Sequence, residues 1–497
     1  MKSKIIILGI CLTRFLFAQE NPNIIFIYAD DMGYGEIEAL NPERSKIPTP
    51  HLNQLVKEGM EFTDAHTTSS VCTPSRYGLL TGRYNWRTKL QKGVVTGGKP
   101  CLIAPGRLTL AQLLKAQGYH TGIFGKWHLD YEYHVPKDVP KVKRRKKEGF
   151  RLASVPVGAT IVDGPLTRGF DTFYGFHHAR SMSSVVEGDK IIKEVHETEI
   201  LPLITQKITE YIGERAAEAK ERKPFFAYFP MSSPHTPISP AEEWKGKTEL
   251  GAYGDFVAQT DGSVGAVMQA LEEHGLKENT IIIFSADNGS SRVPANFEYL
   301  ESKGHYPSAH LRGAKADLWE GGHRVPFILR WPAQVKASSK SHQLISLADM
   351  MATFAEMLDV DLKDNQGEDS VSFYSELSGE EGEAPRESIV FHSYTGKFSI
   401  RQAEWKLLLA HGSGGWSAPK DDEARKKGLL EYQLYNMADD VSETKNLASE
   451  YPEKVENLIT LLKKYVEDGR STLGAKQKND VENIDCLLYT SPSPRDS

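Results

Sequence analysis

The sequence predicts an α/β protein in which a large, mainly parallel sheet is sandwiched by helices, with a smaller α+β subdomain at the C-terminal end. Four short apolar segments, each followed abruptly by polar residues, predict the central strands; they are residues 24–29, 121–125, 225–229 and 281–286. Continuous apolar runs of this length are typical of parallel strands buried on both faces. Helical patterns lie between them, and this alternation indicates an α/β sheet.

The helical segments between the predicted strands have recognisable ends. Thr49 and Pro50 suit the start of a helix that has Leu52 and Leu55 on one face, and Gly59 suits its end. Further helices are predicted before Gly118 and before Gly275, because apolar residues recur there at helical spacing.

The pattern changes from about residue 386. Residues 388–393, 398–401, 405–409 and 431–435 predict short strands, and apolar residues at helical spacing from 455 to 465 predict a final helix. We therefore expect a main domain over residues 19–385 and an α+β subdomain over residues 386–485.

Composition and charge exclude some classes of function. The chain of 497 residues has a net charge of -6, which argues against a nucleic-acid binder. The basic run at residues 141–147 is interpreted as a solvated loop, with a loop that contacts a polyanion as the alternative. After the N-terminal segment, no stretch is apolar enough over enough residues to predict a membrane span.

Both ends of the chain indicate processing or foreign sequence. Residues 1–18 have the plan of a signal peptide, with Lys2 and Lys4 before an apolar run and Ala18 at the cut. We therefore expect a soluble, exported protein of the periplasm or the extracellular space. Residues 486–497 resemble a translated sequencing adapter, with a disordered Pro/Ser tail as the alternative.

The cysteines predict no disulfide framework. Cys11 falls in the predicted signal peptide and Cys486 in the predicted foreign tail, which leaves Cys72 and Cys101. A disulfide between these two is the structural alternative to a chemical role for Cys72, and it would require their Cα atoms to be close.

Polar residues that follow the predicted strands point to a metal site. Asp30 and Asp31 follow the first strand, and Asp287 and Asn288 follow another. Ligands of an open α/β sheet bind beyond the carboxyl ends of its strands, so these side chains are expected to meet there. Carboxylate and amide oxygens suit Ca²⁺, or Mg²⁺, rather than zinc.

The residues around Cys72 predict an anion site beside that metal. Pro74 is expected near the first position of a helix, which places Cys72 at the helix N-terminus, where free N–H groups and the dipole favour an anion. Arg76, Lys126 and Lys315 would add positive charge, and His128 and His235 would move protons.

These segments together resemble a known family. Residues 72–76, Cys-Thr-Pro-Ser-Arg, followed by Tyr-Gly-Leu-Leu-Thr-Gly-Arg, are similar to the signature of type I sulfatases. Supporting blocks stand in the expected order at residues 23–35, 125–128, 233–237, 287–289, 312–315 and 320–326, so the resemblance spans about residues 23–447. The departures are small: Glu36 stands where Asp is commoner, and His323 fills a variable place.

The resemblance implies a fold, a modification and a set of roles. It implies an alkaline-phosphatase-like main domain and a four-stranded antiparallel sheet in the subdomain. A maturation enzyme would oxidise Cys72 to formylglycine, whose hydrated aldehyde attacks sulfur while held on the metal. Asp287 would bind metal and help to deprotonate this nucleophile. His235 and Lys315 would face the leaving group, His128 would take the proton in the elimination step, and Lys126 and Arg76 would stabilise the diol and the sulfate.

The substrate is expected to be a sulfated carbohydrate attacked by an exo-acting enzyme, with 6-sulfated galactose or N-acetylgalactosamine as the working hypothesis. Candidate substrate residues lie in loops next to the motif blocks: Arg87, His177, His178, Arg180, His310 and His323. Two alternatives are a phosphatase or phosphodiesterase of the same superfamily, and a sulfated-glycan-binding protein in which Cys72 is never converted.

Overall fold

The main domain is built on one large sheet in the part of the chain that the computed structural model describes, which is residues 21–138, 144–147, 150–379 and 385–484. The sheet has 12 strands, and in spatial order they are β15 (Ser339–Ser341), β2 (Met60–Phe62), β14 (Phe327–Arg330), β13 (Thr280–Ala286), β1 (Asn23–Asp30), β12 (Phe225–Pro234), β4 (His120–Lys126), β9 (Thr172–Phe176), β10 (Ser184–Glu187), β11 (Lys190–Glu194), β8 (Thr160–Asp163) and β5 (Glu132–His134).

The four predicted strands are four neighbouring strands at the centre of this sheet. β13, β1, β12 and β4 pair in parallel, as expected, and β9 continues the parallel order beside β4. Antiparallel pairs then extend the sheet on both sides, through β14 and β2 at one edge and from β10 to β5 at the other. The sheet is therefore mixed, with a parallel centre whose carboxyl ends share one edge.

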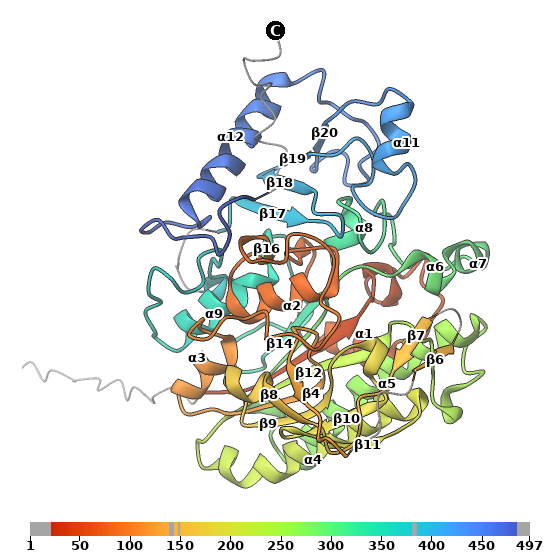
Figure 1. The fold of residues 1–497 in the computed structure, drawn as a ribbon, viewed down its shortest axis with the longest axis vertical. Helices are drawn as coiled ribbons and strands as arrows, with labels where there is room; N and C mark the ends of the chain where they lie inside the picture. Colours follow the sequence, from red (N-terminus) through yellow and green to blue (C-terminus); the bar gives the residue numbers. More distant parts are fainter. Residues whose placement is uncertain (1–20, 139–143, 148–149, 380–384, 485–497) are drawn as a thin grey trace, which may run out of the picture.

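Helices cover the sheet in two groups (Figure 1). α4 (Glu197–Lys220) and α5 (Gly251–Glu273) pack on each other and on β12, and α1 (Pro50–Glu58) packs on α5. α2 (Cys72–Thr81), α3 (Leu110–Ala116) and α9 (Met350–Met357) form the second group. The predicted helix ends at Gly59, Gly118 and Gly275 are confirmed, since each glycine follows a helix within two residues. Four shorter helices are α6 (Arg292–Ala295), α7 (Phe297–Ser302), α8 (Glu320–His323) and α10 (Tyr374–Ser378).

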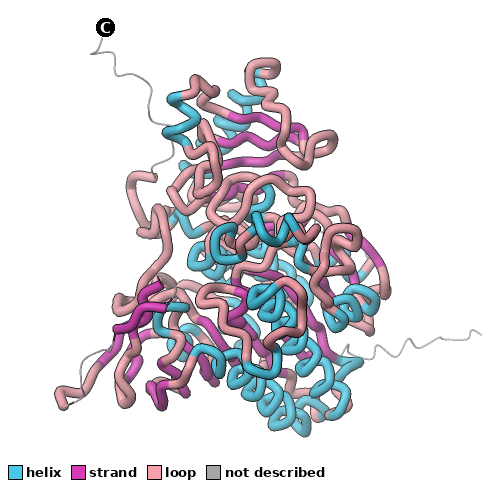
Figure 2. Tube along the Cα trace, turned by 90° about the vertical axis from the view of Figure 1, so that its right-hand side faces the viewer, coloured by secondary structure: helices cyan, strands magenta, loops and turns pink. Residues whose placement is uncertain are grey.

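The C-terminal subdomain carries the expected four-stranded antiparallel sheet. Its strands are β17 (Ser388–His392), β18 (Phe398–Gln402), β19 (Trp405–Leu408) and β20 (Gln433–Asn436), joined by α11 (Asp421–Lys426) and followed by α12 (Pro452–Asp468). In the side view this sheet lies above the main domain (Figure 2). Tyr84 and Trp86 of the main domain are buried in the core that α12 forms on this sheet, so the two parts share apolar packing.

Two small pairs of strands lie outside the two sheets described above. They are β3 (Ala65–His66) with β16 (Ile345–Ser346) and β6 (Arg144–Lys147) with β7 (Phe150–Ala153). Part of the basic run is therefore a strand, and residues 141–143 lie outside the described residues. The predicted signal peptide and the 486–497 tail also lie outside them.

Cys72 and Cys101 are both free and buried, so the disulfide alternative is wrong. Among the described helices, none is both long and apolar enough to cross a membrane.

Candidate active site

The central strands deliver their polar residues to one edge, as predicted. Asp30 is the last residue of β1, and because Ala29 pairs with Ala286 of β13, Asp287 lies level with it on the neighbouring strand. Lys126 is the last residue of β4, and His235 follows β12 directly. Asp31 has a positive φ of 66°, a left-handed turn that ends the strand and leads into the following loop.

Cys72 stands in the first turn of α2, above these strand ends. The helix begins at Cys72, two residues before the predicted start at Pro74, and all ten of its residues are buried. The hydroxyl of Thr73 donates to the carbonyl of His128 at 3.0 Å and ties the first turn to the end of β4. The N–H groups and dipole at this end of the helix favour an anion beside residue 72.

Three cations pair with three carboxylates around Cys72. Lys126 Nζ donates to both oxygens of Asp30 at 2.8 and 2.7 Å. Arg76 donates through Nε and Nη2 to Asp287 Oδ2 at 3.1 and 2.7 Å. Lys315 Nζ donates to Asp31 Oδ1 at 2.5 Å. The predicted catalytic and metal residues are therefore brought together, with their formal charges balanced.

The oxygen atoms of this site fit a hard divalent cation. Asp30, Cys72 and Asp287 each offer one atom within 4.8 Å of the other two, and so do Asp30, Asp31 and His235. Asn288 donates from Nδ2 to Asp31 at 2.8 Å, and its buried Oδ1 has no hydrogen-bond partner among the described residues. A buried acceptor without a donor is costly, and a cation would satisfy it.

The pKa directions follow from burial and from this pairing. Burial raises the pKa of the Cys72 thiol, and Lys126 and Lys315 oppose the rise. Burial and the neighbouring Asp30 raise the pKa of Asp287 against the attraction of Arg76. The carboxylates thus repel one another in spite of their cations, and a divalent cation would relieve that repulsion.

His128 faces the site as a neutral base. Burial lowers the pKa of His128 well below its ordinary value, and Lys126 adds to the effect. Its Nε2 lies 3.1 Å from the carbonyl of Val95, which can only accept, so Nε2 carries the proton. Within the part of the chain that the structure describes, the buried Nδ1 has no hydrogen-bond partner and keeps a free lone pair.

Two of the predicted substrate residues, His177 and His178, lie beside His128. The ring centroids of His177 and His178 are 6.1 and 5.6 Å from that of His128. Arg180 is exposed and follows them in a single 3-10 turn, Ala179–Ser181. On the other flank, His235 Nδ1 donates to the Thr236 carbonyl at 2.5 Å, and Nε2 lies 3.7 Å from Asp31 Oδ2.

The structure does not bring the other three predicted substrate residues into the site. Arg87 is buried, pairs with Asp369 at 2.7 Å and stacks on Trp86 beneath the small subdomain. His323 is buried against His66 and Lys406, between the domain and the subdomain. His310 is exposed, and its carbonyl accepts from Ser442. Their nearness to the motif blocks in sequence did not indicate where their side chains would point.

A buried network behind Asn288 escaped the sequence analysis. The Glu36 carboxylate accepts from Ser290 at 2.7 Å, from His305 at 2.8 Å, and from Tyr253. Ser290 in turn accepts from the Gly33 N–H at 2.8 Å and so links this network to the loop after Asp31. The unusual Glu at position 36 was the one sequence signal that pointed to it.

Gly289 lets this loop approach the Glu-Gly-Gly block. A Cβ atom at Gly289 would lie 1.8 Å from the carbonyl oxygen of Gly321, so no side chain fits. The Gly289 N–H donates to Gly322 at 3.0 Å.

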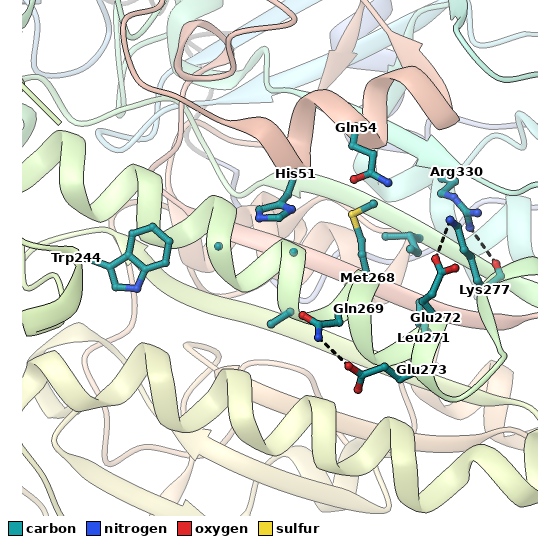
Figure 3. A pocket seen from close by; sticks show the side chains of 14 residues that line it. His51, Gln54, Trp244, Met268, Gln269, Leu271, Glu272, Glu273, Lys277 and Arg330 are labelled. Carbon is teal, nitrogen blue, oxygen red and sulfur yellow. Dashed lines mark hydrogen bonds and ion pairs between the residues drawn. The ribbon is translucent and has the colours of Figure 1, made fainter. Parts of the chain in front are cut away.

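A further pocket lies away from this site. It has a volume of ≈ 490 Å³ and opens between α1 and α5, with Trp244 and His51 at one end and Arg330 at the other (Figure 3). Ile282, near the start of β13, lines it. It therefore lies toward the amino ends of the parallel strands, away from Asp287.

Fold and site together define a hydrolase of anionic esters, because a buried nucleophile position, balanced charges and an oxygen-rich metal set meet at one sheet edge. The chain belongs to the sulfatase family: the family model named Sulfatase matches residues 22–360. It is therefore a sulfuric ester hydrolase.

Relatives agree over most of the chain. It is 31% identical to the N-acetylgalactosamine-6-O-sulfatase of Bacteroides thetaiotaomicron, over 89% of this chain and 93% of that one. It is 28% identical to human arylsulfatase A, over 95% and 94%. A solved structure from a study of glycosaminoglycan metabolism by Bacteroides thetaiotaomicron superposes with a TM-score of 0.75 at 28% identity, over 90% of this chain and 99% of that one.

Proposed function

We propose that this protein is a formylglycine-dependent sulfatase that removes sulfate esters from a glycan. One observation carries the proposal: Cys72 stands in the first turn of a buried helix, within 4.8 Å of ligand atoms of Asp30 and Asp287, among three buried cations. The encoded thiol is a soft ligand among hard oxygens. Conversion to formylglycine by a maturation enzyme replaces it with a hydrated aldehyde, which supplies one hydroxyl to attack sulfur and a second to expel the sulfate.

The residues around position 72 bind and orient the sulfate. Arg76, Lys126 and Lys315 are held in place by their carboxylates, so their charge needs no reorganisation as negative charge develops on the leaving oxygen. The N-terminal end of α2 adds its dipole to the same point.

Asp30, Asp31, Asp287 and Asn288 would hold Ca²⁺, or Mg²⁺, with residue 72 as a further ligand. The unsatisfied Oδ1 of Asn288 supports this set. When bound, the ion supplies a Lewis acid that polarises the sulfate and the attacking hydroxyl.

Proton transfers are assigned to the two histidines. His128 carries its proton on Nε2, so its free Nδ1 can accept the proton of the second hydroxyl during elimination. His235 has Nδ1 fixed on the Thr236 carbonyl and turns Nε2 toward Asp31, beside Lys315. As an imidazolium, His235 would donate one proton from Nε2 to the leaving oxygen and become neutral, while Lys315 would face the same oxygen.

The proposed substrate is a sulfated carbohydrate, cleaved from its end, with 6-sulfated N-acetylgalactosamine or galactose first. The relative from Bacteroides thetaiotaomicron is named for N-acetylgalactosamine-6-sulfate, and it spans nearly this whole chain. His177 and His178 adjoin His128, and Arg180 follows them in an exposed turn, so the three offer polar groups that suit sugar hydroxyls. We propose an exported enzyme, in keeping with the signal peptide predicted at residues 1–18.

Sulfate release tests the proposal. Protein made with an active maturation enzyme is assayed on an aryl sulfate, an aryl phosphate and a panel of sulfated mono- and oligosaccharides, with mass spectrometry of the peptide that holds residue 72. We expect sulfate release, a preference for sulfate over phosphate, and a mass that matches formylglycine. Faster turnover of the phosphate would instead support a phosphatase, and an intact thiol with glycan binding but no turnover would support a binding protein.

A further inference from the structure

A pair of aromatic rings, an exposed Trp416 and a half-buried Tyr394, lies on the C-terminal subdomain. Trp416 is 45% exposed, although tryptophan normally buries most of its surface. Its ring lies 4.9 Å from that of Tyr394, centroid to centroid, with 58° between the planes. We call these two residues the aromatic pair. Since apolar packing leaves nearly half of Trp416 open, the exposed face is available to a ligand.

The residues that follow Lys315 hold the aromatic pair in place. Asp317 Oδ1 accepts from the backbone N–H groups of Trp416 and Ser417 at 2.9 and 3.0 Å. The Tyr394 N–H donates to the carbonyl of Ala316 at 3.4 Å. Both rings are therefore anchored within two residues of Lys315, a cation of the site.

A loop over residues 91–99 connects the aromatic pair to the other side of the site. The Gly93 N–H donates to the Tyr394 carbonyl at 2.8 Å. Two residues on, the Val95 N–H donates to Thr73 Oγ1 at 3.3 Å, and its carbonyl accepts from His128. The loop thus runs from the aromatic pair to the residues that flank Cys72, so the rings lie at the rim of the site.

Two lysines flank the aromatic pair. A Cβ atom at Gly396, two residues after Tyr394, would lie 3.4 Å from the Cβ of Lys92 in this loop. A Cβ at Gly414, two residues before Trp416, would lie 3.5 Å from that of Lys397. Lys92 is exposed and Lys397 is half-buried. Both lysine side chains therefore start from backbone that lies beside the segments that carry the aromatic pair.

We propose that the aromatic pair, Lys92 and Lys397 form a subsite for the sugar next to the sulfated one, and that this neighbouring sugar is acidic. The proposal rests on the proposed function of the same site. The C–H face of a pyranose ring packs on an aromatic ring and buries apolar surface, while its hydroxyls stay in water. A carboxylate or sulfate on that sugar would pair with the lysines. The enzyme would then favour acidic oligosaccharides over single sugars.

Matched substrates and variants test the subsite. The substrates are 6-sulfated N-acetylgalactosamine alone, the same sugar linked to a uronic acid, and the same sugar linked to neutral galactose. The variants are Trp416→Ala, Trp416→Phe, Lys92→Met and, as control, Tyr451→Ala. Tyr451 is 44% exposed and pairs with Trp405 at 5.1 Å in the same subdomain, which makes it a match for Trp416 without the contacts to the Lys315 loop.

We expect Trp416→Ala to lower kcat/KM on both disaccharides by about 10- to 100-fold and on the monosaccharide by less than about twofold. Trp416→Phe should recover most of the loss, and Lys92→Met should affect only the acidic disaccharide. An equal loss on all three substrates would overturn the proposal, since it would mean that the rings only support Lys315, and so would a loss of the same size in Tyr451→Ala.

Failure of the proposed function has a different signature. If the wild-type enzyme cleaves an aryl sulfate but none of the three sugars, the glycan assignment fails. Calorimetric titration of the Cys72→Ala variant with the acidic disaccharide then decides the subsite by itself: binding that Trp416→Ala abolishes supports the subsite, and binding that ignores Trp416, or no binding, overturns it.

Discussion

Two buried clusters of charged side chains lie on the same loops of this protein, yet only one of them has complete hydrogen bonding. The candidate active site contains Cys72 and Lys315, and the second cluster, which we call the Lys406 cluster, contains His66, Glu320 and His323 a few residues away. Both place carboxylates and histidines within 4.8 Å of one another, so both satisfy a simple geometric test for a metal site.

The Lys406 cluster is closed. The Lys406 ammonium donates to Glu320 and Glu443 at 2.8 Å each. Nε2 of His323 lies 3.1 Å from that ammonium and 3.0 Å from the Leu318 carbonyl, so it has a hydrogen-bond partner in either tautomer. The Nδ1 atoms of His323 and His66 lie 3.0 Å apart, and His66 donates from Nε2 to Asp64 at 2.8 Å. A metal ion could bind here only by displacing the Lys406 ammonium. Because Lys406 belongs to the subdomain and Glu320 to the main domain, the ion pair between them joins the two parts.

The active site is open by contrast. Asn288 Oδ1 and His128 Nδ1 are buried and have no hydrogen-bond partner in the described structure. Charge density alone does not distinguish these two clusters, whereas their unsatisfied polar atoms do.

Removal of the Cys72 thiol in the open cluster is expected to have the largest effect on activity. Cys72→Ala is expected to lower kcat for sulfate ester cleavage by about 10⁴-fold or more, because no residue then attacks sulfur. Its thermal unfolding should change little, since the variant loses one sulfur atom. The measurement is sulfate release at saturating substrate. Residual activity within tenfold of wild type would rule out Cys72 as the source of the nucleophile.

Breaking the closed cluster should instead reduce stability. Lys406→Met leaves Glu320 and Glu443 buried without their cation, which is expected to lower the free energy of unfolding by about 3–5 kcal/mol. Lys426→Met on α11 is the control, because Lys426 is exposed, and it should change stability by less than about 0.5 kcal/mol. Urea unfolding of both variants provides the test, and equal midpoints would contradict a joining role for Lys406.

Metal addition should separate the two clusters. Calcium at 100 times its dissociation constant is expected to raise the free energy of unfolding of chelator-treated protein by about 2.7 kcal/mol. Asn288→Ala should lose most of this response, whereas His66→Gln should keep it. Thermal unfolding with and without the ion measures both. If His66→Gln loses the response and Asn288→Ala keeps it, the ion binds at the Lys406 cluster, which would contradict the proposed metal site.

Titration of His392, a buried histidine between the two clusters, is expected to give the smallest effect, a change in stability with pH. His392 ends β17, and its carbonyl accepts from Ser69 and Ser70 in front of Cys72. Burial lowers the pKa of His392 to about 4. The folded state therefore binds its proton more weakly than the unfolded state, so stability is lost as the pH falls from about 6.5 toward 4, by about 2 kcal/mol at pH 5. The difference in unfolding free energy between wild type and His392→Gln should shrink by that amount from pH 7.5 to pH 5, and a pH-independent difference would refute the assignment.

Much of the site could be predicted because its residues are attached to strong local patterns. Asp30, Lys126, His235 and Asp287 each follow an apolar run, and parallel strands must align their carboxyl ends at one edge. The antiparallel extensions could not be predicted in the same way. β8, β10 and β11 are four or five residues long with mixed polarity, and their pairing depends on distant neighbours.

The sequence by itself determined the central strands, a helix whose N-terminal end lies at Cys72 and the set of charged groups that meet there, because each depends on spacing along the chain. Only the tertiary structure decided which of these groups face a ligand. Arg87 and His323 stand beside motif blocks, yet Asp369 and Lys406, distant in sequence, bind them inside the protein. Trp416 lies far from every motif block in sequence, yet the loop after Lys315 holds it at the rim of the site. A side chain's environment is set by the partners that folding brings to it, and those partners carry no fixed separation in sequence.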